Sequence, residues 1–437
     1  MGIVGCILGF LVVIYLCYKD WSVYLASIVG AAVVMLFNWM PFVDTLVGIY
    51  VSGMFIPIKS FFFILLFGSI QSKIYSESGA AYAIADTIMS KLLKPGSSET
   101  KKNVIAISVL LAIGIVLNMG GINASVFIVL MYPVALTIFE YCDIPKRFIL
   151  GVLGACSYTF TLTMPGSPQV TNVAAMSALG TEADVALVPG LVGAAVEIVV
   201  IIVLLNIFIN KAKAKGEHFA LHPLDPHYDK NTPKPNFWVS IIPLVVLFIA
   251  FNVVKININI CVIASSILSI ILFWPQLKEK NMREILSNGA SESIPMSLTV
   301  AAICGFATIV TSTDAFNTML EAITSINMSP MLICAVVVSI MCMLTGGSST
   351  GQLVSLPLIA PKLLELGLNV NAIHRISCFA ATTLDSLPYS GAILMMLPLC
   401  RMKLKDLYPP LFITTVVATT CGTIAVIIMC ALFPGLC

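Results

Sequence analysis

Long apolar stretches follow one another along almost the whole chain, and few of them contain a charge. Of the 437 residues, 59% are apolar and 10% are charged, whereas an ordinary globular chain has about 45–50% apolar and 25% charged residues. A helix of roughly 20 apolar residues crosses the hydrocarbon core of a bilayer. The sequence therefore excludes a water-soluble fold and predicts an all-α polytopic membrane protein.

The apolar stretches predict fourteen helices, several of them too short to cross a bilayer alone. They cover residues 3–17, 22–38, 60–76, 103–118, 122–140, 147–163, 186–209, 237–254, 257–274, 290–311, 330–345, 350–366, 375–397 and 408–432. Between residues 211 and 236 the composition changes to Lys, His, Asp and Pro, which is typical of a solvated linker.

The basic residues predict how the chain is threaded. If the segments alternate across the membrane, all but four of the 23 Lys and Arg residues fall on one side; the exceptions are Lys59, Lys255, Lys362 and Arg375. Loops rich in Lys and Arg lie in the cytoplasm. We therefore expect an integral plasma (inner) membrane protein with cytoplasmic lysine-rich loops and both termini outside the cytoplasm.

The near balance of charges argues against a nucleic-acid partner, and the scattered cysteines argue against disulfides and a metal site. With 21 Asp and Glu against the 23 basic residues, nothing indicates a nucleic-acid partner. Thirteen cysteines stand singly without a C-x-x-C pair, which argues against a disulfide framework and against a metal site. We expect membrane lipid and a small molecule as partners, and no cofactor.

A glycine pair recurs at corresponding places in the two halves of the chain. GGINAS at 120–125 and GGSSTG at 346–351 each lie between two short apolar stretches. Each is followed by a polar break that contains proline, at 162–172 and at 384–393. The threading gives the two units opposite orientations. The sequence therefore predicts two inverted repeats, with about ten transmembrane helices, two re-entrant hairpins and two broken helices.

This organisation divides the chain into five parts. We expect N-terminal scaffold helices, a first inverted repeat, a cytoplasmic linker, two linking scaffold helices and a second inverted repeat, at residues 1–58, 59–210, 211–236, 237–285 and 286–437, respectively.

The four breaks predict a binding site. Irregular backbone at membrane depth is tolerated only where it is buried in protein or lines a cavity, and the start of a half-helix favours an anion. Convergent breaks in inverted repeats are typical of secondary transporters. The candidate substrate-binding residues are Gly120, Gly121, Asn123, Ser125, Thr163, Gly166, Ser167, Gln169, Asn172, Gly346, Gly347, Ser348, Ser349, Thr350, Ser386, Tyr389 and Ser390. The alternative is that these small residues pack helices together.

Asp385 is the candidate for ion coupling. A carboxyl group inside a membrane segment is costly and usually serves a function or has a partner. Asp385 would bind the coupling cation or carry the proton; the alternative is a pair with Arg375 or a cap on the half-helix. Glu197 is a second candidate for carrying a proton, with a packed, protonated side chain as the alternative.

At these motifs the chain resembles the gluconate permease (GntP) family of the ion transporter superfamily, over residues 20–432. The most specific match is MPGSPQ at 164–169, and further matches lie at 78–92, 126–133 and 387–392. The resemblance implies proton-coupled uptake of small hydroxy-carboxylates such as gluconate or 3-hydroxybutyrate. It also implies a homodimer of scaffold and transport domains, with an elevator movement.

The chain departs from the best-known branch of that family at protonatable positions. Ser125 and Met164 stand where typical members have Glu and His, and a family His aligns near Asp385. These departures leave sodium coupling open. We therefore expect symport of a small organic acid with H⁺ or Na⁺. A di- or tricarboxylate or an amino acid is the alternative substrate.

Other function classes find less support. The sequence has no H-E-x-x-H motif and no P-loop, so neither a zinc hydrolase nor an ATP-driven pump is indicated. We expect the protein not to be an enzyme. A channel would show a filter or a ring of charges; a pore lined by hydroxyl groups remains the alternative to a carrier.

Overall fold

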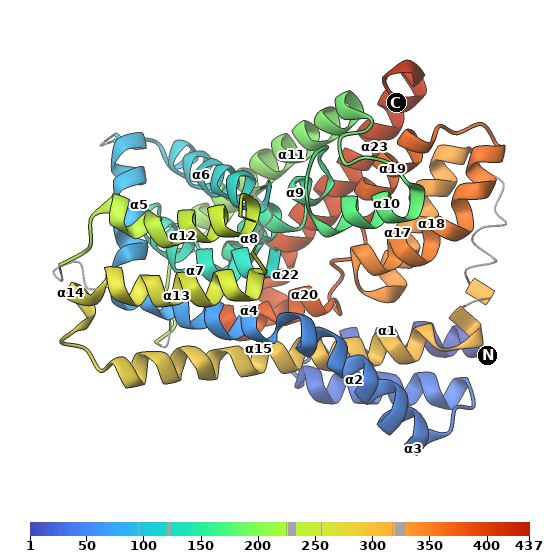
Figure 1. Ribbon diagram of the computed structural model, residues 1–437, viewed down its shortest axis with the longest axis horizontal. Helices are drawn as coiled ribbons and strands as arrows, with labels where there is room; N and C mark the ends of the chain where they lie inside the picture. Colours follow the sequence, from blue (N-terminus) through green and yellow to red (C-terminus); the bar gives the residue numbers. More distant parts are fainter. Residues whose placement is uncertain are drawn as a thin grey trace.

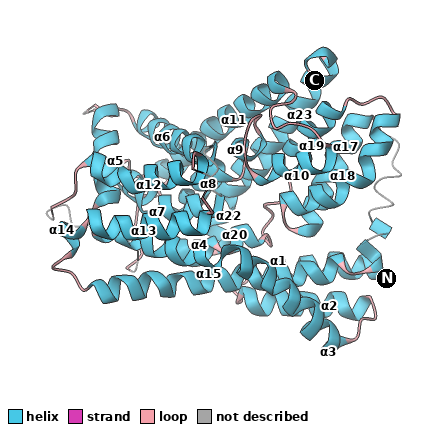
Figure 2. Cartoon of the chain, in the orientation of Figure 1, coloured by secondary structure: helices cyan, strands magenta, loops and turns pink. Residues whose placement is uncertain are grey.

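The computed structural model describes residues 1–437 except 95, 120–123, 224, 226–232, 255, 317 and 320–327. Helices make up nearly all of the described chain, which contains no strand (Figures 1 and 2). Five helical segments are long and apolar enough to cross a membrane: Phe42–Lys59, Glu99–Met119, Leu187–Ala214, Met282–Thr311 and Leu404–Leu432. The predicted all-α polytopic fold is confirmed.

Seven helices follow the apolar stretches within two residues at each end. Four of them are α1 (Gly2–Tyr18), α2 (Val23–Phe37), α12 (Phe237–Asn252) and α13 (Ile258–Leu272). The other three are α7 (Ala124–Tyr141), α17 (Pro330–Thr345) and α18 (Ser348–Glu365). The short α14 (Trp274–Leu277) follows α13. Here an uninterrupted apolar run and the polar residues beside it determine the helix ends.

Two regions differ from the prediction. The predicted helix at 60–76 is part of α4 (Val51–Glu77), which continues α3 (Phe42–Asp44) and the π-helical η1 (Thr45–Tyr50). Next, α5 (Ala80–Leu92) has no counterpart among the predicted helices. It is amphipathic, with buried alanines on one face and Lys91 in its last turn. A search for continuous apolar runs therefore passes over it.

The first long helices of the two halves pack against each other in opposite directions. In α15 (Met282–Thr311), Thr308 lies against Gly53 of α4, and Gly289 lies against Ile70 of α4. A Cβ atom on Gly289 would lie 2.8 Å from the Cα of Ile70, so the two backbones are in contact. Residue numbers rise along one helix as they fall along the other, so the pair is antiparallel (Figure 1).

The last long helices of the two halves also pack in opposite directions. They are α11 (Leu187–Ala214) and α23 (Ala418–Leu432). Gly193 of α11 lies against Val426, and Glu197, one turn later, lies against Gly422. The α23 helix continues α22 (Leu404–Phe412) through the π-helical η3 (Ile413–Val417), and the short η4 (Pro434–Leu436) follows it.

Each half contains a helical hairpin and a broken helix. The hairpins are α6 (Glu99–Met119) with α7 (Ala124–Tyr141), and α17 (Pro330–Thr345) with α18 (Ser348–Glu365). The first broken helix consists of η2 (Lys146–Phe148), α8 (Ile149–Ser157), α9 (Phe160–Thr163) and α10 (Val170–Leu179). The second consists of α19 (Val370–Ala381), α20 (Gly391–Leu394) and α21 (Met396–Cys400). Breaks therefore occur where proline and polar residues interrupt the apolar sequence.

Gly351 determines how closely the two arms of the second hairpin approach. A Cβ atom at this position would lie 2.5 Å from the backbone Cα and N of Cys342 on α17. We expect Gly351→Val to lower the free energy of unfolding by about 1–3 kcal/mol or more, because overpacking must move α18 away from α17. Thermal unfolding of the purified protein measures this. Gly48→Ala is the control, since no atom of the described residues lies within 4 Å of a Cβ atom there. Equal melting temperatures for both variants would contradict the prediction.

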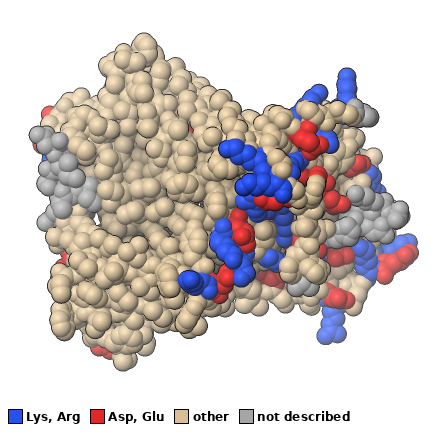
Figure 3. Space-filling model, turned by 180° about the vertical axis from the view of Figure 1, so that it is seen from behind, with Lys and Arg blue, Asp and Glu red and all other residues tan. Residues whose placement is uncertain are grey.

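Charged side chains gather at one end of the molecule. On the face seen in Figure 3, Lys, Arg, Asp and Glu crowd this end and the rest of the surface is almost free of charge. Both chain termini lie at the opposite end (Figure 1). The charged loops and the two termini thus lie at opposite ends, as the alternating threading of the chain predicts. Which end faces the cytoplasm stays a prediction.

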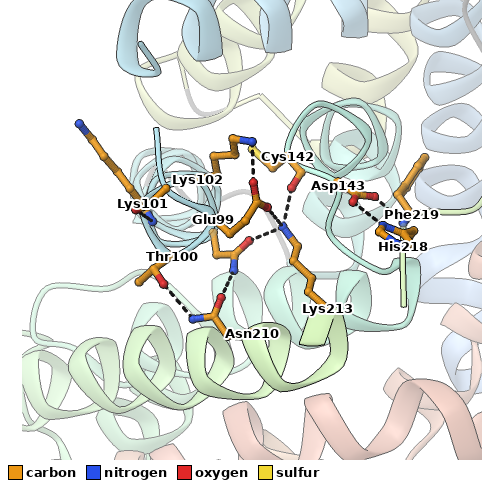
Figure 4. A network of polar contacts seen from close by, with 12 residues as sticks. Glu99, Thr100, Lys101, Lys102, Cys142, Asp143, Asn210, Lys213, His218 and Phe219 are labelled. Carbon is orange, nitrogen blue, oxygen red and sulfur yellow. Dashed lines mark hydrogen bonds and ion pairs between the residues drawn. The ribbon is translucent and has the colours of Figure 1, made fainter. Parts of the chain in front are cut away.

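A polar network at the charged end joins helices of the first half (Figure 4). Lys213, near the end of α11, donates to Glu99 (2.8 Å), to Asn103 (2.9 Å) and to the carbonyl of Cys142 (2.7 Å). Asn103 also donates to Asn210 at 2.9 Å. The network holds the start of α6 and the end of α7 against the last turns of α11.

Asp143 and His218 extend this network to the start of the linker. His218 Nδ1 lies 2.7 Å from one Asp143 oxygen, and the N–H of Phe219 donates to the other at 2.9 Å. Partial burial raises the pKa of Asp143, but these two hydrogen bonds, together with the electrostatic attraction of His218 and Lys213, outweigh the effect of burial and hold the pKa below its usual value.

Asp225 corrects the expectation of a wholly solvated linker. Its side chain is fully buried and forms ion pairs with Lys146 and, at 3.5 Å, with Arg401. Arg401 also pairs with Glu292 of α15 at 2.6 Å. A polar composition marks a loop, but it does not reveal cations elsewhere in the chain that bury one of its carboxylates.

Candidate functional site

The breaks of the two halves converge on one cavity of about 190 Å³. Residues from the first hairpin, the first break, the tip of the second hairpin and the second break all reach it. The lining is Ala124, Tyr158, Leu162, Gln169, Val170, Gly346, Gly347, Ser348, Ser349, Asp385, Ser386, Ser390, Ala392 and Ile393. Segments more than 200 residues apart in the sequence thus form one site.

Eight of the predicted site residues line this cavity. They are Gln169, Gly346, Gly347, Ser348, Ser349, Asp385, Ser386 and Ser390. Their part in binding stays a prediction. The predicted residues do not include the apolar wall, which is formed by Ala124, Tyr158, Leu162, Val170, Ala392 and Ile393. Four of these lie inside the predicted breaks, Leu162 and Val170 at 162–172 and Ala392 and Ile393 at 384–393, and that position is the signal that could have identified them.

The tip of the second hairpin presents the start of α18 to the cavity. Gly346 ends α17 in the left-handed region (φ 66°), and Gly347 precedes the first turn of α18. A residue with a side chain is strained at such a φ, so glycine allows the chain to turn tightly here. The first backbone N–H groups of α18 have no acceptor within the helix, and they give this wall partial positive charge.

Asp385 brings a carboxyl group to the same cavity. Asp385 is 8% exposed, and Ser348 and Ser386 line the cavity beside it. Among the described residues, Oδ1 of Asp385 has no hydrogen-bond partner. A buried oxygen of this kind can accept a proton or bind a cation.

Arg375 does not pair with Asp385, which rules out one alternative of the sequence analysis in this structure. Arg375 is fully buried and donates to the carbonyls of Thr163 (2.6 Å), Ala183 (2.8 Å) and Val185 (2.8 Å). It also donates to Asn172 Oδ1 at 3.1 Å. This guanidinium of the second half therefore holds the backbone around the break of the first half.

His374, next to Arg375, also contacts Asn172 in the first break, and it was not among the predicted site residues. Its Nε2 lies 3.2 Å from Asn172 Oδ1, and its Nδ1 lies 2.6 Å from the hydroxyl of Thr181. The amide nitrogen of Asn172 donates to the carbonyl of Leu162 at 2.9 Å, which leaves Oδ1 as the acceptor. These partners assign the ring proton to Nε2, so Nδ1 accepts from Thr181.

Other predicted residues support the breaks rather than line the cavity. Thr163 and Ser167 are buried and donate to the carbonyls of Phe160 and Thr161. Gly166 has a φ of 75°, and its N–H donates to the carbonyl of Ala183 at 2.9 Å.

The remaining predicted site residues either do not line the cavity or are not among the described residues. Tyr389 donates to the carbonyl of Met343 at 2.5 Å, and Thr350 is exposed. Residues Gly120, Gly121 and Asn123 lie outside the described residues, as does the side chain of Ser125.

Comparison with known proteins identifies a protein family that this chain matches. The model of the GntP family permeases matches residues 1–273. A protein of Bacillus subtilis (strain 168), described as the uncharacterized transporter YxjC, is 23% identical over 469 residues, which cover 96% of this chain and 97% of that protein. The crystal structure of the Alcanivorax borkumensis YdaH transporter is similar with a TM-score of 0.40 and 11% identity, over 90% of this chain and 89% of that chain.

The family and the relative both indicate a transporter. This agrees with the apolar helices of an integral membrane protein and with a cavity among its helices that is lined by both polar and apolar side chains. Because the family model spans more than half of the sequence, the chain belongs to the GntP family of permeases.

Proposed function

We propose that the protein is a secondary active transporter that carries a small organic acid, such as gluconate, 3-hydroxybutyrate or another hydroxy-carboxylate, into the cell with H⁺ or Na⁺. The observation that carries this proposal is the cavity at which breaks from both halves meet beside Asp385. Secondary transporters bind substrate and coupling ion at such breaks, near the middle of the membrane.

The cavity wall suits a carboxylate of the substrate. The start of α18 offers backbone N–H groups, and Ser348, Ser349 and Ser390 offer hydroxyl donors. Leu162 and Ile393 form an apolar wall for the carbon chain. A hydroxy-acid has both kinds of surface, so it complements this lining.

Asp385 gives a physical reason for coupling. If Asp385 is ionised, a second carboxylate about 4 Å away is repelled by roughly 4 kcal/mol at an effective dielectric constant of 20. A repulsion of that size weakens binding by about a thousandfold. A proton or Na⁺ on Asp385 removes it, so the acid and the cation bind together. This cooperation is the requirement for symport.

The packing of the long helices is consistent with alternating access by inverted repeats. The pairs α4–α15 and α11–α23 join corresponding helices of the two halves, and both pairs are antiparallel. An inverted repeat requires this relation. The charged end would face the cytoplasm and both termini the outside. A homodimer of scaffold and transport domains that moves as an elevator follows the family resemblance.

Uptake into proteoliposomes tests the proposal. Labelled gluconate, 3-hydroxybutyrate, lactate and citrate are offered separately, with a pH gradient or a sodium gradient imposed. We expect saturable accumulation of one acid with one of the gradients, and counterflow when unlabelled acid is inside. Uptake that never saturates and shows no counterflow would instead indicate a channel. Uptake of none of these acids would direct the search to amino acids and dicarboxylates.

Ser349→Ala tests the contact with the acid. Loss of a hydrogen bond to a charged group costs about 1.5–3 kcal/mol, so we expect KM for the transported acid to rise about 10- to 100-fold. Initial uptake rates over a range of acid concentrations measure KM. The control is Ser355→Ala on the same helix, because the hydroxyl of Ser355 donates to the carbonyl of Gly351 away from the cavity. An unchanged KM in Ser349→Ala would remove this residue from the site.

A further inference from the structure

Glu197 is a carboxyl group that the proposed binding site does not use. It lies on α11 and is fully buried. Neither of its side-chain oxygens has a hydrogen-bond partner among the described residues. A buried polar group of this kind normally has a partner, and an ionisable group inside a membrane protein usually has a function.

The opposite helix is shaped around this carboxyl group. A Cβ atom on Gly422 of α23 would lie 2.5 Å from Oε1 of Glu197 and 2.6 Å from its Cγ. Any side chain at position 422 would therefore displace Glu197. Glycine leaves a notch in α23 into which the carboxyl group fits.

No charged group among the described residues pairs with Glu197. The titratable side chains on α11 itself and on the elements that pack against it are Lys211 and Lys213 on α11, Glu99, Lys101 and Lys102 on α6, His374, Arg375 and Cys378 on α19, Cys421 and Cys430 on α23, and Cys437 beyond η4. Within the described chain, none of them forms a hydrogen bond or ion pair with Glu197. An ionised carboxylate without a partner in such a place costs several kcal/mol, so Glu197 holds a proton in this structure.

A stripe of threonine hydroxyls connects this region with the cavity. Ser386, which lines the cavity, donates to the carbonyl of Thr415 at 3.5 Å. The hydroxyl of Thr419 donates to the same carbonyl at 2.7 Å, and that of Thr423 donates to the carbonyl of Thr419 at 2.8 Å. Thr419 and Gly422 are three residues apart and share one face of α23. The polar stripe therefore runs from the second break to the notch that holds Glu197.

We propose that Glu197 is a second proton-binding site of the transporter, which exchanges its proton with the cavity along the Thr415–Thr419 stripe when α11 and α23 separate during transport. The step is a simple dissociation: the carboxylic acid becomes a carboxylate and releases one proton to water in the cavity. This inference rests on the proposed function. It differs from the role of Asp385, which lies in the cavity and would control the binding of the acid.

Glu197→Gln separates proton coupling from transport. Glutamine has nearly the shape of a protonated glutamate, so we expect the variant to fold and to exchange acid in counterflow at the wild-type rate. For one co-transported proton, a gradient of one pH unit sustains about tenfold accumulation, because one pH unit equals about 1.4 kcal/mol. We expect Glu197→Gln to lose this accumulation. Wild-type accumulation in the variant, or a wild type driven by sodium alone, would overturn the coupling role.

Infrared spectroscopy tests the proton site without transport. The purified wild type should show the C=O stretching band of a protonated carboxylic acid, and Glu197→Gln should lose the part of that band that Glu197 contributes. Identical spectra would overturn the inference. If the two spectra differ in this way but the wild type transports none of the acids, the proposed function fails while the proton site stands.

Matched threonine variants test the stripe. Thr419→Val removes the hydroxyl on the same face of α23 as Gly422 and should reduce accumulation driven by a pH gradient. Thr414→Val is the control, because Thr414 is equally buried but donates to the carbonyl of Gly151 on α8 at 3.0 Å. Equal accumulation by the two variants would exclude the stripe as the path of the proton.

Discussion

Asp385→Asn is expected to abolish accumulation of the acid while leaving the fold intact. Asparagine has the shape of a protonated aspartate and carries no charge, so it no longer repels a substrate carboxylate. The roughly thousandfold effect of the cation on acid binding, which follows from a repulsion of about 4 kcal/mol, should disappear. Binding measured at several pH values and sodium concentrations, together with uptake driven by each gradient, checks this.

Asp314→Asn is the matched control, since Asp314 is an exposed aspartate of the second half that does not line the cavity. It should leave both measurements unchanged. If Asp385→Asn transports at full rate with the wild-type dependence on pH and sodium, Asp385 has no part in coupling. Glu197→Gln should also lose accumulation driven by the pH gradient. Binding of the acid to that variant should still depend on the cation, and this distinguishes it from Asp385→Asn.

Arg375→Met is expected to lower the yield of folded protein severely. The change removes four hydrogen bonds and leaves the carbonyls of Thr163 and Val185 without a donor. The carbonyl of Ala183 keeps the N–H of Gly166, and Asn172 keeps the ring of His374. Each polar group left unpaired inside the protein costs about 1–3 kcal/mol, so these two carbonyls together remove about 2 kcal/mol or more. The whole free energy of unfolding of a domain is about 5–15 kcal/mol. Thermal unfolding and the amount of monodisperse protein after purification measure the effect.

Arg147→Met is the control for the loss of an arginine. Arg147 is paired with Glu217 at 2.7 Å, but a third of its side chain is exposed to solvent. A pair this exposed contributes about 0–1 kcal/mol, so its loss should change the melting temperature little. Arg375→Lys should fall in between, since one ammonium group cannot reach four acceptors in a fixed planar arrangement. A normal melting temperature for Arg375→Met would contradict the role assigned to Arg375.

Several features of the site were predictable because they depend on neighbours in the sequence. An apolar run long enough to cross a membrane, interrupted by Gly346 and Gly347, predicts two short helices and a turn. The structure has α17, a left-handed glycine and α18 at that place. The polar segment after Ala381 likewise ends α19, and the helix resumes only at Gly391.

The roles of the charged residues were not predictable in this way. A pair of Arg375 with Asp385 was one alternative from the sequence, yet Arg375 holds the backbone of the first break, about 190 residues earlier. Asp225 was expected in a solvated linker, yet it is buried against Lys146 and Arg401. Composition and spacing describe a residue and its nearest neighbours, and these partners come from other parts of the chain.

The sequence by itself determined the membrane environment, most of the helices and the positions of the breaks, because hydrophobicity, glycine and proline act on the few residues around them. Only the tertiary structure decided that the breaks meet in one cavity, that Asp385 enters it without Arg375, and that Glu197 fits into a notch at Gly422. Those outcomes depend on which helix faces are in contact across the two halves. Helix packing determines that arrangement, and no local segment of the chain contains it.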